Sequence, residues 1–176
     1  MKYIANFLIM LWVLIIPISA CADSQQSIEV AFSPNQGATK AIVKLIGEAQ
    51  KSVRVAAYSF TSKDIAAALL AAHKRGVDVK AVLDKSNLKA KYSSATFLAN
   101  VGIPTRINFK YAIMHSKYLI IDGVTLETGS FNYTKAAEKN NAENVIIFRK
   151  QPKIAKQYEN NWQKLWDESE DYEAAY

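Results

Sequence analysis

Apolar positions recur along this chain with two different periods, and each change of period marks the boundary of a predicted element. Residues 53–60 form a nearly continuous apolar run, and residues 77–83 alternate apolar and polar side chains, as strands in a sheet do. The intervening residues repeat apolar side chains at helical spacing and stop at Gly76. A second helical pattern, at 39–50, precedes the first of these strands. This alternation predicts an α/β sandwich with right-handed crossovers.

The rest of the chain adds further strands and helices. Strands are predicted at 28–32, 104–109, 117–121, 124–128 and 143–149. Helices are predicted at 93–100, 135–138 and 152–166, and the expected N-caps are Thr61 or Ser62 for the helix before Gly76 and Thr134 for the helix at 135–138. The acidic tail, 167–176, is expected to be frayed. The length of 176 residues suits one domain.

The first 22 residues are predicted to be an export signal. Lys2 supplies a positive start, and residues 4–16 are almost wholly apolar but shorter than the ~20 residues of a membrane span. Ala20-Cys21-Ala22 fits an Ala-x-Ala cleavage site, which would release residues 23–176 into the periplasm or the medium. The same segment also fits a lipobox, in which Cys21 would be lipidated and would anchor the protein to a bacterial membrane. An uncleaved anchor is the third alternative.

The part of the chain after this signal is basic and has no cysteine. Cys21 is the only cysteine of the chain, so no disulfide is expected inside the domain, and its stability must come from its core. Without Lys2 the chain keeps 21 of its 22 basic residues against 16 acidic ones. That balance favours a polyanionic partner, either nucleic acid or an anionic membrane, and it fits a moderately basic soluble protein about equally well.

The stretch that begins at His115 concentrates polar residues at strand spacing. Two apolar, β-favouring runs flank Asp122 and Gly123, which predicts a β-hairpin because glycine adopts positive φ at low cost. Side chains alternate between the two faces of a strand, so His115 and Lys117 point the same way and Asp122 points the other way. Asp122 is therefore predicted to form the turn or a structural ion pair rather than to join a catalytic site.

This arrangement resembles the signature of the phospholipase D superfamily. That signature is His-x-Lys, four residues, Asp, six residues and then Gly-Ser/Gly-x-Asn. The chain matches it without departure at His115, Lys117, Asp122, Gly129, Ser130 and Asn132. Within this set Gly129 is expected to be a structural position, because glycine lets the backbone turn sharply or approach a neighbour closely.

The resemblance extends beyond the motif and covers nearly all of the chain after the signal. Residues 53–60, 61–84 and 127–138 resemble the small exported bacterial endonucleases that carry a single copy of the motif. The resemblance implies one α/β domain with a mixed β-sheet sandwiched between helices. It also implies phosphodiesterase activity.

Each residue type in this stretch has a chemical use. Imidazole is a nucleophile for phosphorus at neutral pH, so His115 is the candidate nucleophile. Lys117 and Asn132 can neutralise the two non-bridging oxygens of a phosphodiester. Glu143 is the candidate carboxylate that orients the imidazole, with Ser130 holding the arrangement. The resemblance implies the same roles for these positions.

The leaving alkoxide also needs a proton, and one imidazole cannot attack phosphorus and protonate a leaving group on the opposite side. The chain has two histidines, so either His73 or a second copy of His115 supplies the acid. His73 falls in the last turn of an amphipathic helix, where a structural role is expected. We therefore expect a homodimer whose two-fold axis passes near paired His115 residues. The resemblance implies the same pairing, because larger relatives carry two copies of the motif in one chain.

No metal or other cofactor is expected, because the sequence offers no carboxylate cluster or His/Cys set with metal-ligand spacing. Five basic residues either line a groove for a phosphate backbone or belong to a scattered solvated surface. They are Lys85, Lys89, Lys91, Arg106 and Lys110.

Three functions compete at this stage. The small size, the basic balance, the export signal and the resemblance favour a sequence-nonspecific endonuclease that acts on DNA, with RNA as a second nucleic acid to consider. A phospholipase D-type hydrolase or phosphatidyl transferase would use the same site and would need an apolar channel or a membrane-facing surface. A phosphate-binding module without catalysis would not require the full residue set.

Overall fold

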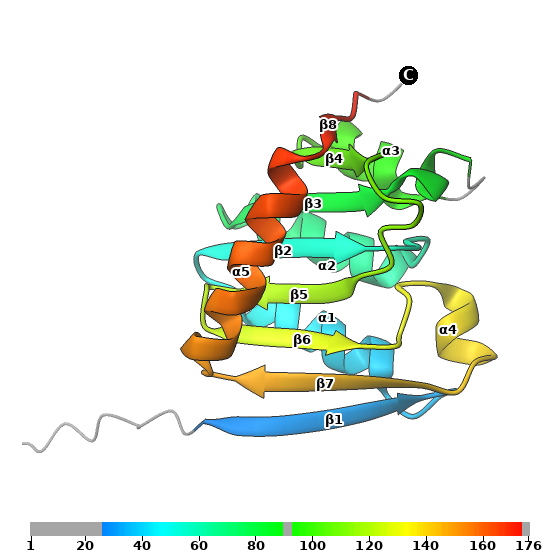
Figure 1. Ribbon diagram of the computed structural model, residues 1–176. Coiled ribbons are helices and arrows are strands. Elements are labelled where there is room, and N and C mark those ends of the chain that lie inside the picture. Colours follow the sequence, from blue (N-terminus) through cyan, green and yellow to red (C-terminus); the bar gives the residue numbers. More distant parts are fainter. Residues whose placement is uncertain (1–25, 90–92, 174–176) are drawn as a thin grey trace, which may run out of the picture.

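One mixed sheet of eight strands runs through the computed structural model, which describes residues 26–89 and 93–173 (Figure 1). The strands lie in the order β1-β7-β6-β5-β2-β3-β4-β8. Their bounds are β1 Ser27–Ser33, β2 Ser52–Ala57, β3 Asp78–Asp84, β4 Thr105–Asn108, β5 Lys117–Ile121, β6 Thr125–Gly129, β7 Glu143–Arg149 and β8 Glu170–Asp171. β2, β3 and β4 pair in parallel, and the other neighbours pair antiparallel. The predicted signal, with Cys21, and Lys91 lie outside the described residues.

Helices cover both faces of the sheet. α1 (Ala38–Glu48), α2 (Lys63–Lys74) and α3 (Ser94–Asn100) lie on one face, and α5 (Pro152–Asp167) crosses the other (Figure 1). The 3-10 turn η1 (Lys85–Leu88) and α4 (Lys135–Lys139) lie in connections between strands. The predicted fold class, an α/β domain with a mixed sheet sandwiched between helices, is confirmed. Within the described ranges no helix is long and apolar enough to span a bilayer.

Alternation along the strands divides the core into two layers. In β2, Val53 and Val55 pack under α1 and α2, whereas Ala56 packs under α5, and all three are fully buried. Trp162 and Leu165 fill the α5 layer from the helix side. Burial on both faces explains why the run at 53–60 is almost continuously apolar.

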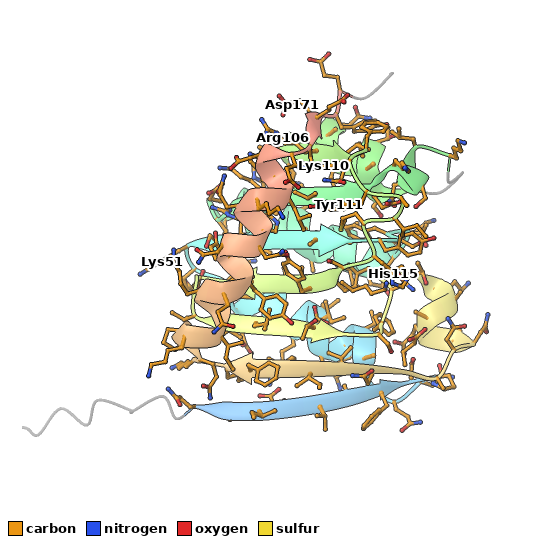
Figure 2. All side chains as sticks on the ribbon, in the orientation of Figure 1. Lys51, Arg106, Lys110, Tyr111, His115 and Asp171 are labelled. Atoms are coloured by element: carbon orange, nitrogen blue, oxygen red, sulfur yellow. The ribbon has the colours of Figure 1, made fainter. Side chains whose placement is uncertain are left out.

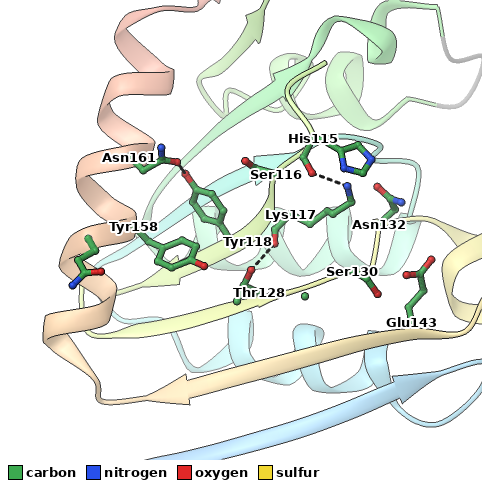
Figure 3. Close-up of a pocket in the computed structure, with 12 residues that line it drawn as sticks. His115, Ser116, Lys117, Tyr118, Thr128, Ser130, Asn132, Glu143, Tyr158 and Asn161 are labelled. Carbon is green, nitrogen blue, oxygen red and sulfur yellow. Dashed lines mark hydrogen bonds between the residues drawn. The ribbon is translucent and has the colours of Figure 1, made fainter. Parts of the chain in front are cut away.

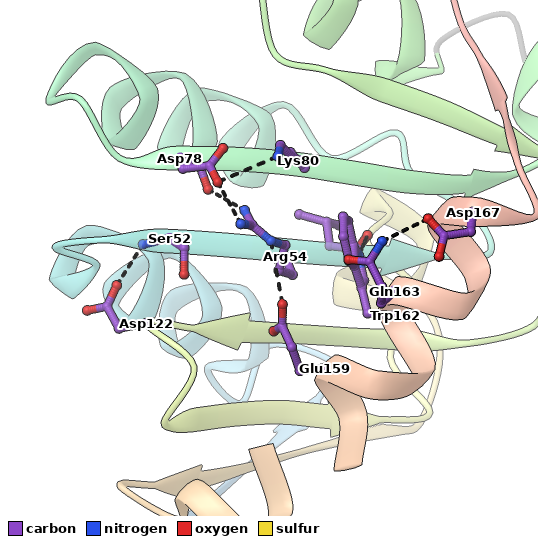
Figure 4. A network of polar contacts seen from close by, with 10 residues as sticks. Ser52, Arg54, Asp78, Lys80, Asp122, Glu159, Trp162, Gln163 and Asp167 are labelled. Atoms are coloured by element: carbon purple, nitrogen blue, oxygen red, sulfur yellow. Dashed lines mark hydrogen bonds and ion pairs between the residues drawn. The ribbon is translucent and has the colours of Figure 1, made fainter. Parts of the chain in front are cut away.

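Polar contacts fix α5 on its face of the sheet (Figure 4). Trp162 Nε1 donates a hydrogen bond of 2.8 Å to the Val55 carbonyl oxygen. The Arg54 guanidinium lies 5.4 Å from the Trp162 ring and pairs with Asp78 at 2.6 Å and with Glu159 at 3.7 Å. The helix is thereby tied to β2 and β3, and its first half reaches toward the strands that carry the phospholipase D-like motif.

The predicted helix caps are present, but the prediction of a frayed tail is wrong for its described part, residues 167–173. Ser62 Oγ accepts from Ile65 N at the start of α2, and Thr134 Oγ1 accepts from Ala137 N at the start of α4. In the tail, β8 pairs antiparallel with β4, and the Asp171 carboxylate accepts from Arg106 Nε at 2.7 Å. The acidic composition does not prevent pairing here, because a basic residue on the neighbouring strand compensates it.

Candidate active site

Lys117 is the first residue of β5, and His115 precedes it by two residues. Both lie beside Tyr58, the residue that follows β2. The ring centroids of His115 and Tyr58 are 4.6 Å apart, and Lys117 Nζ lies 5.0 Å from the Tyr58 centroid. Lys117 Nζ also donates a hydrogen bond of 2.7 Å to the His115 carbonyl oxygen (Figure 3). His115 is exposed and Lys117 is buried, so an accessible imidazole lies beside an amino group that is largely withdrawn from solvent.

The turn after β6 carries Ser130 and Asn132 to the same region. Gly129 ends β6 so close to β7 that an added Cβ would lie 2.1 Å from the Asn144 carbonyl oxygen, so only glycine fits. Ser130 N donates to that oxygen at 3.2 Å, and Asn144 N donates to Ser130 Oγ at 3.1 Å. These hydrogen bonds hold the turn against β7. Asn132 Oδ1 is buried and accepts no hydrogen bond from the residues that the structure describes.

One pocket of about 760 Å³ collects the predicted catalytic side chains (Figure 3). All five contribute to its wall: His115, Lys117, Ser130, Asn132 and Glu143. The structure therefore brings the predicted set together, although the residues come from the start of β5, the turn after β6 and the start of β7. Their individual roles in catalysis stay predictions.

The pocket continues along the sheet to α5, and this half of the wall was not predicted. Gln157, Tyr158 and Asn161 come from the helix, and Tyr118 of β5 donates its hydroxyl hydrogen to Asn161 Oδ1 at 2.8 Å. The sequence signal for this wall was the polar pair at 157 and 161, four residues apart and hence on one helical face. Tyr58 was missed as well, because it lies inside the run 53–60, which was predicted to be one strand, whereas β2 ends at Ala57.

Glu143 opens β7 and acts on the pocket through its charge. Burial lowers the pKa of Lys117, and the carboxylate of Glu143 offsets part of that shift. Glu143 Oε1 accepts a hydrogen bond of 3.0 Å from Asn141 Nδ2, and in the described structure no hydrogen bond joins it to His115. The orienting contact predicted between these two side chains is thus not made within the single chain. In the described ranges no group of three or more His, Cys, Asp or Glu residues is arranged to hold a metal ion.

Asp122 lies at the other end of the hairpin, as its position in the alternation predicted. It adopts a φ of 55°, and Gly123 after it adopts 70°, which forms the tight turn. Asp122 Oδ1 accepts from Lys51 N at 2.7 Å and from Ser52 N at 2.9 Å, and Oδ2 accepts from Gln50 N at 3.0 Å. These contacts agree with the predicted structural role, and the partners are backbone amides rather than a cation.

Comparison with known proteins gives the family of this site. Residues 42–166 match the family model described as "Cardiolipin synthase, PLD-like domain". The chain belongs to the phospholipase D superfamily. It is a phosphodiesterase of that superfamily, and its motif is the superfamily signature that the sequence indicated.

Three members of the superfamily are similar to this chain in sequence or in structure. A phospholipase D of Rickettsia typhi is 42% identical over 139 residues, which are 79% of this chain and 68% of the relative. A mitochondrial cardiolipin hydrolase of Xenopus laevis is 32% identical over 152 residues, 86% of this chain and 69% of the relative. The crystal structure of Nuc from Salmonella typhimurium, a phospholipase D family member, superposes with a TM-score of 0.83 at 43% identity and covers 85% of this chain and 99% of Nuc.

The two histidines of this phospholipase D superfamily chain lie at opposite ends of the sheet. Lys117, two residues after His115, pairs with Ala57 at the carboxyl end of β2. His73 lies in the last turn of α2, just before β3, whose first residue pairs with Ser52 at the amino end of β2. A six-residue strand spans roughly 16 Å, so His73 is far from His115 and does not line the pocket.

The basic residues predicted for a phosphate groove do not gather at this superfamily site. Arg106 lies at the β4–β8 edge with Asp171, away from His115, and its guanidinium stacks 4.4 Å from the Trp166 ring (Figure 2). Lys110 pairs with Glu168 at 2.6 Å, and Lys85 Nζ donates to the Tyr111 carbonyl oxygen at 2.9 Å. Lys89 is exposed after η1. None of these four lines the pocket, so the groove stays a prediction.

Proposed function

We propose that this phosphodiesterase is an endonuclease that cuts DNA without sequence preference and without a metal ion. The observation that carries the proposal is the pocket wall, on which no aliphatic side chain lies among the described residues. Hydroxyl, amide and ammonium groups suit the charged backbone of a nucleic acid, whereas acyl chains need apolar walls. The resemblance to small single-motif bacterial endonucleases supports the same choice. RNA carries the same diester and is the second nucleic acid to test.

In the first step, His115 attacks phosphorus in line with the bond that breaks. A P–N bond forms to the imidazole and gives a phosphohistidine, while the P–O bond to the leaving strand breaks. Lys117 and Asn132 donate hydrogen bonds to the non-bridging oxygens, on which negative charge is held during the transfer. Ser130 keeps the turn that carries Asn132 against β7 through its two hydrogen bonds with Asn144.

The second proton carrier is the His115 of a second copy of the chain. The partner's imidazolium protonates the leaving oxygen, and the resulting neutral imidazole then removes a proton from water. The hydroxide attacks phosphorus, the P–N bond breaks and His115 is restored. One water is consumed and one diester becomes an alcohol and a phosphomonoester. His73 does not supply this proton in our scheme, because it lies at the opposite end of the sheet.

An exposed apolar strip on β1 supports the pairing of two chains. Ile28, Val30 and Phe32, every second residue of the strand, are 61%, 62% and 48% exposed. They share the α5 side of the sheet, where α5 packs mainly against β2 to β6 and leaves the β1 edge open (Figure 1). Phe32 also lines a hollow together with Ser130, so the strip reaches the site. A second copy seated on this strip would bring its own His115 to the shared pocket.

A phospholipase D-type hydrolase or phosphatidyl transferase is the second candidate, and one observation favours it. Ile113 is 55% exposed and lies two residues before His115, and Leu88 is also exposed. Exposed apolar side chains beside a site suit contact with a lipid surface. The relatives named phospholipase D and mitochondrial cardiolipin hydrolase carry lipid substrates in their names.

The two candidates separate when the purified protein is incubated with plasmid DNA and with cardiolipin vesicles, both in excess chelator. We expect nicked and then linear DNA and no hydrolysed lipid. Lipid hydrolysis without DNA cleavage would replace the nuclease by the second candidate. Binding of either substrate without cleavage would favour the phosphate-binding module, and DNA cleavage that the chelator abolishes would refute metal independence. His115→Asn, purified in parallel, controls for contaminating nucleases.

We also propose that the protein leaves the cytoplasm. The support is the sequence of residues 1–22, with its positive start, apolar run and Ala-x-Ala site. The mass of the exported protein decides the form: cleavage after Ala22 leaves Asp23 as the first residue, whereas lipidation leaves a modified Cys21. Full-length protein in the cytoplasmic fraction would contradict export.

A further inference from the structure

A buried carboxyl group lies beneath the turn that carries Ser130 and Asn132. Glu127 is 1% exposed, and on β6 it stands between Leu119 of β5 and Ile147 of β7, on the α1 side of the sheet. Its Oε1 has no hydrogen-bond partner among the described residues. A polar group in such surroundings costs stability, so its presence at this position requires an explanation in function.

The one hydrogen bond that the Glu127 side chain makes in the described structure links it to the site turn. Tyr133 OH donates to Glu127 Oε2 at 2.7 Å, and Tyr133 follows Asn132 directly. The Tyr133 ring has no exposed surface and packs edge-to-face on Phe60 at 5.8 Å. Through this hydrogen bond, β6 is therefore joined to the far end of the turn that leaves it.

Tyr133 also joins the two halves of the site through its backbone. Its N–H donates to the Ser59 carbonyl oxygen at 3.1 Å, and its carbonyl oxygen accepts from Thr61 N and Ser62 N at 2.9 and 2.8 Å. The segment that it binds begins one residue after Tyr58, whose ring contacts His115 and lies near Lys117. A shift of Tyr133 would therefore change the spacing between the imidazole side and the Asn132 side of the pocket.

Asn132 depends on this backbone placement more than its neighbours do. Ser130 is held by two hydrogen bonds to β7. Asn132 Oδ1, in contrast, has no partner within the described chain. The position of the Asn132 amide group is therefore set by the backbone on either side, and Tyr133 is the residue that fixes it on the carboxyl side.

We propose that Glu127 is a positioning residue, whose hydrogen bond to Tyr133 holds the turn over 129–132 and places the Asn132 amide for the phosphate. The contact between Asn132 and phosphate rests on the proposed function; the link from Glu127 to the placement of Asn132 does not. Because the role is geometric, an uncharged side chain of the same shape that accepts the hydrogen bond of Tyr133 fulfils it. Glutamine is such a side chain.

Four variants test this role in the full chain with bis(4-nitrophenyl) phosphate, a diester that contains neither nucleoside nor lipid. Glu127→Leu and Tyr133→Phe each remove the hydrogen bond, and we expect kcat to fall by about 10- to 100-fold with little change in KM. Glu127→Gln is expected to keep kcat within about twofold, because it keeps the bond. The double variant Glu127→Leu/Tyr133→Phe is expected to be no slower than the slower single variant, because both remove the same contact.

Tyr172→Phe is the matched control. It also deletes a tyrosine hydroxyl, whose partner is Thr96 Oγ1 at 2.8 Å, but at the β4–β8 edge of the sheet. We expect it to lower stability without changing kcat. Circular dichroism at the assay temperature verifies that each variant is folded. A folded Glu127→Leu with the kcat of the unmodified protein, a Gln variant as slow as the Leu variant, or additive losses in the double variant would each overturn the proposal.

A second readout separates this proposal from the proposed function. The side-chain amide signals of Asn132, assigned by their loss in Asn132→Asp, are recorded by NMR without substrate. We expect them to move in Glu127→Leu and Tyr133→Phe and to stay in place in Glu127→Gln. Unmoved signals in the first two variants refute the positioning role. An unmodified protein that cleaves no diester refutes the proposed function instead, and the NMR result stands apart from it.

Discussion

The two ends of the β5–β6 hairpin both carry polar motif residues, and they use them in opposite ways. At the turn, the carboxylate of Asp122 accepts from three consecutive backbone amides. At the open end, where β5 begins and β6 ends, His115 is exposed and lines the pocket together with Asn132. A polar group whose hydrogen bonds are filled inside the chain stabilises the fold, whereas one with unfilled capacity beside a pocket is available to a ligand. The hairpin is thus anchored at one end and equipped for chemistry at the other.

Glu127 lies between these ends and belongs to neither class. Its side chain is buried in an apolar layer, yet the carboxyl group makes only one hydrogen bond within the described residues. Its position suggests that the chemistry at the open end needs support from inside the fold. The comparison therefore yields separate expectations for residues at the open end, at the middle and at the anchored end.

Exchange of His115 for asparagine is expected to have the largest effect on catalysis and almost none on the fold. Diesterase activity should fall roughly a thousandfold or more, because the nucleophile and the partner's acid are both lost. The melting temperature should stay close to that of the unmodified protein, because the imidazole is exposed. Steady-state cleavage and thermal unfolding measure the two quantities. Substantial residual cleavage by the folded variant would remove His115 from the mechanism.

Replacement of Glu127 by glutamine is expected to change how stability depends on pH. Burial raises the pKa of Glu127 from its ordinary value of 4.5 to about 8, and the Tyr133 hydrogen bond offsets part of that rise. In the unfolded chain the Glu127 carboxyl loses its proton near pH 4.5, whereas in the folded chain it stays protonated until the pH approaches about 8. The stability that the protonated carboxyl provides is therefore complete at low pH and is lost as pH rises between the two values.

The size of this pH effect follows from the raised pKa. Within that window, the free energy of unfolding of the unmodified protein should fall by about 1.4 kcal/mol per pH unit from this group alone. Glu127→Gln should lack that part of the slope, so the variant gains relative stability toward pH 8, near the folded-state value. Urea unfolding of both proteins at several pH values, at one protein concentration, measures the difference. Parallel pH profiles would show that the carboxyl is already ionised in the fold.

Exchange of Asp122 for alanine is expected to lower stability by about 1–3 kcal/mol, because three amide donors at the start of β2 lose their acceptor. The kcat of the folded fraction should not change, because the side chain points away from the pocket. Asp122→Asn keeps an acceptor oxygen and should lose less. Urea unfolding and cleavage kinetics give both values. A lower kcat at unchanged folded fraction would mean that the anchored end takes part in the chemistry.

Local rules in the sequence predicted those parts of the molecule that depend on neighbouring residues. The bounds of β7, Glu143–Arg149, and the N-caps Ser62 and Thr134 agree with the structure. The opposite positions of Asp122 and His115 followed from the two-residue period of a strand. Each of these features depends on contacts or alternation within a few residues, so the sequence contains enough information to predict it.

The features that the sequence did not reveal depend on distant segments. β8 exists because Asp171 meets Arg106 across 65 positions of the chain. Tyr58 continues an apolar run, and only the end of β2 at Ala57 turns it toward His115. The pocket wall on α5 requires the crossing of that helix over β5, which Trp162 fixes through Val55. No local pattern specifies which distant residues meet, so these contacts appear only in the folded chain.

A smaller effect on catalysis is expected when the proposed dimer is disrupted. The same exchange, valine for aspartate, is made at two positions to test whether a second copy of the chain completes the site. Val30 lies on the β1 strip that we assign to the second copy, and Val124 lies beside the anchored turn, 38% exposed. Val30→Asp should shift the protein toward monomer and lower activity by at least about tenfold at micromolar concentration, because a charge would be buried in the interface. Val124→Asp introduces the same charge away from the strip and should change neither quantity.

Analytical ultracentrifugation and cleavage rates over a dilution series measure assembly and activity together. In the unmodified protein, specific activity should fall on dilution at the concentration where the dimer dissociates, because each site needs two copies of His115. Val30→Asp should move that concentration upward and leave the rate of the remaining dimer unchanged. A Val30→Asp monomer with full specific activity would mean that one open end suffices, and the proton carrier would then have to be sought within the single chain.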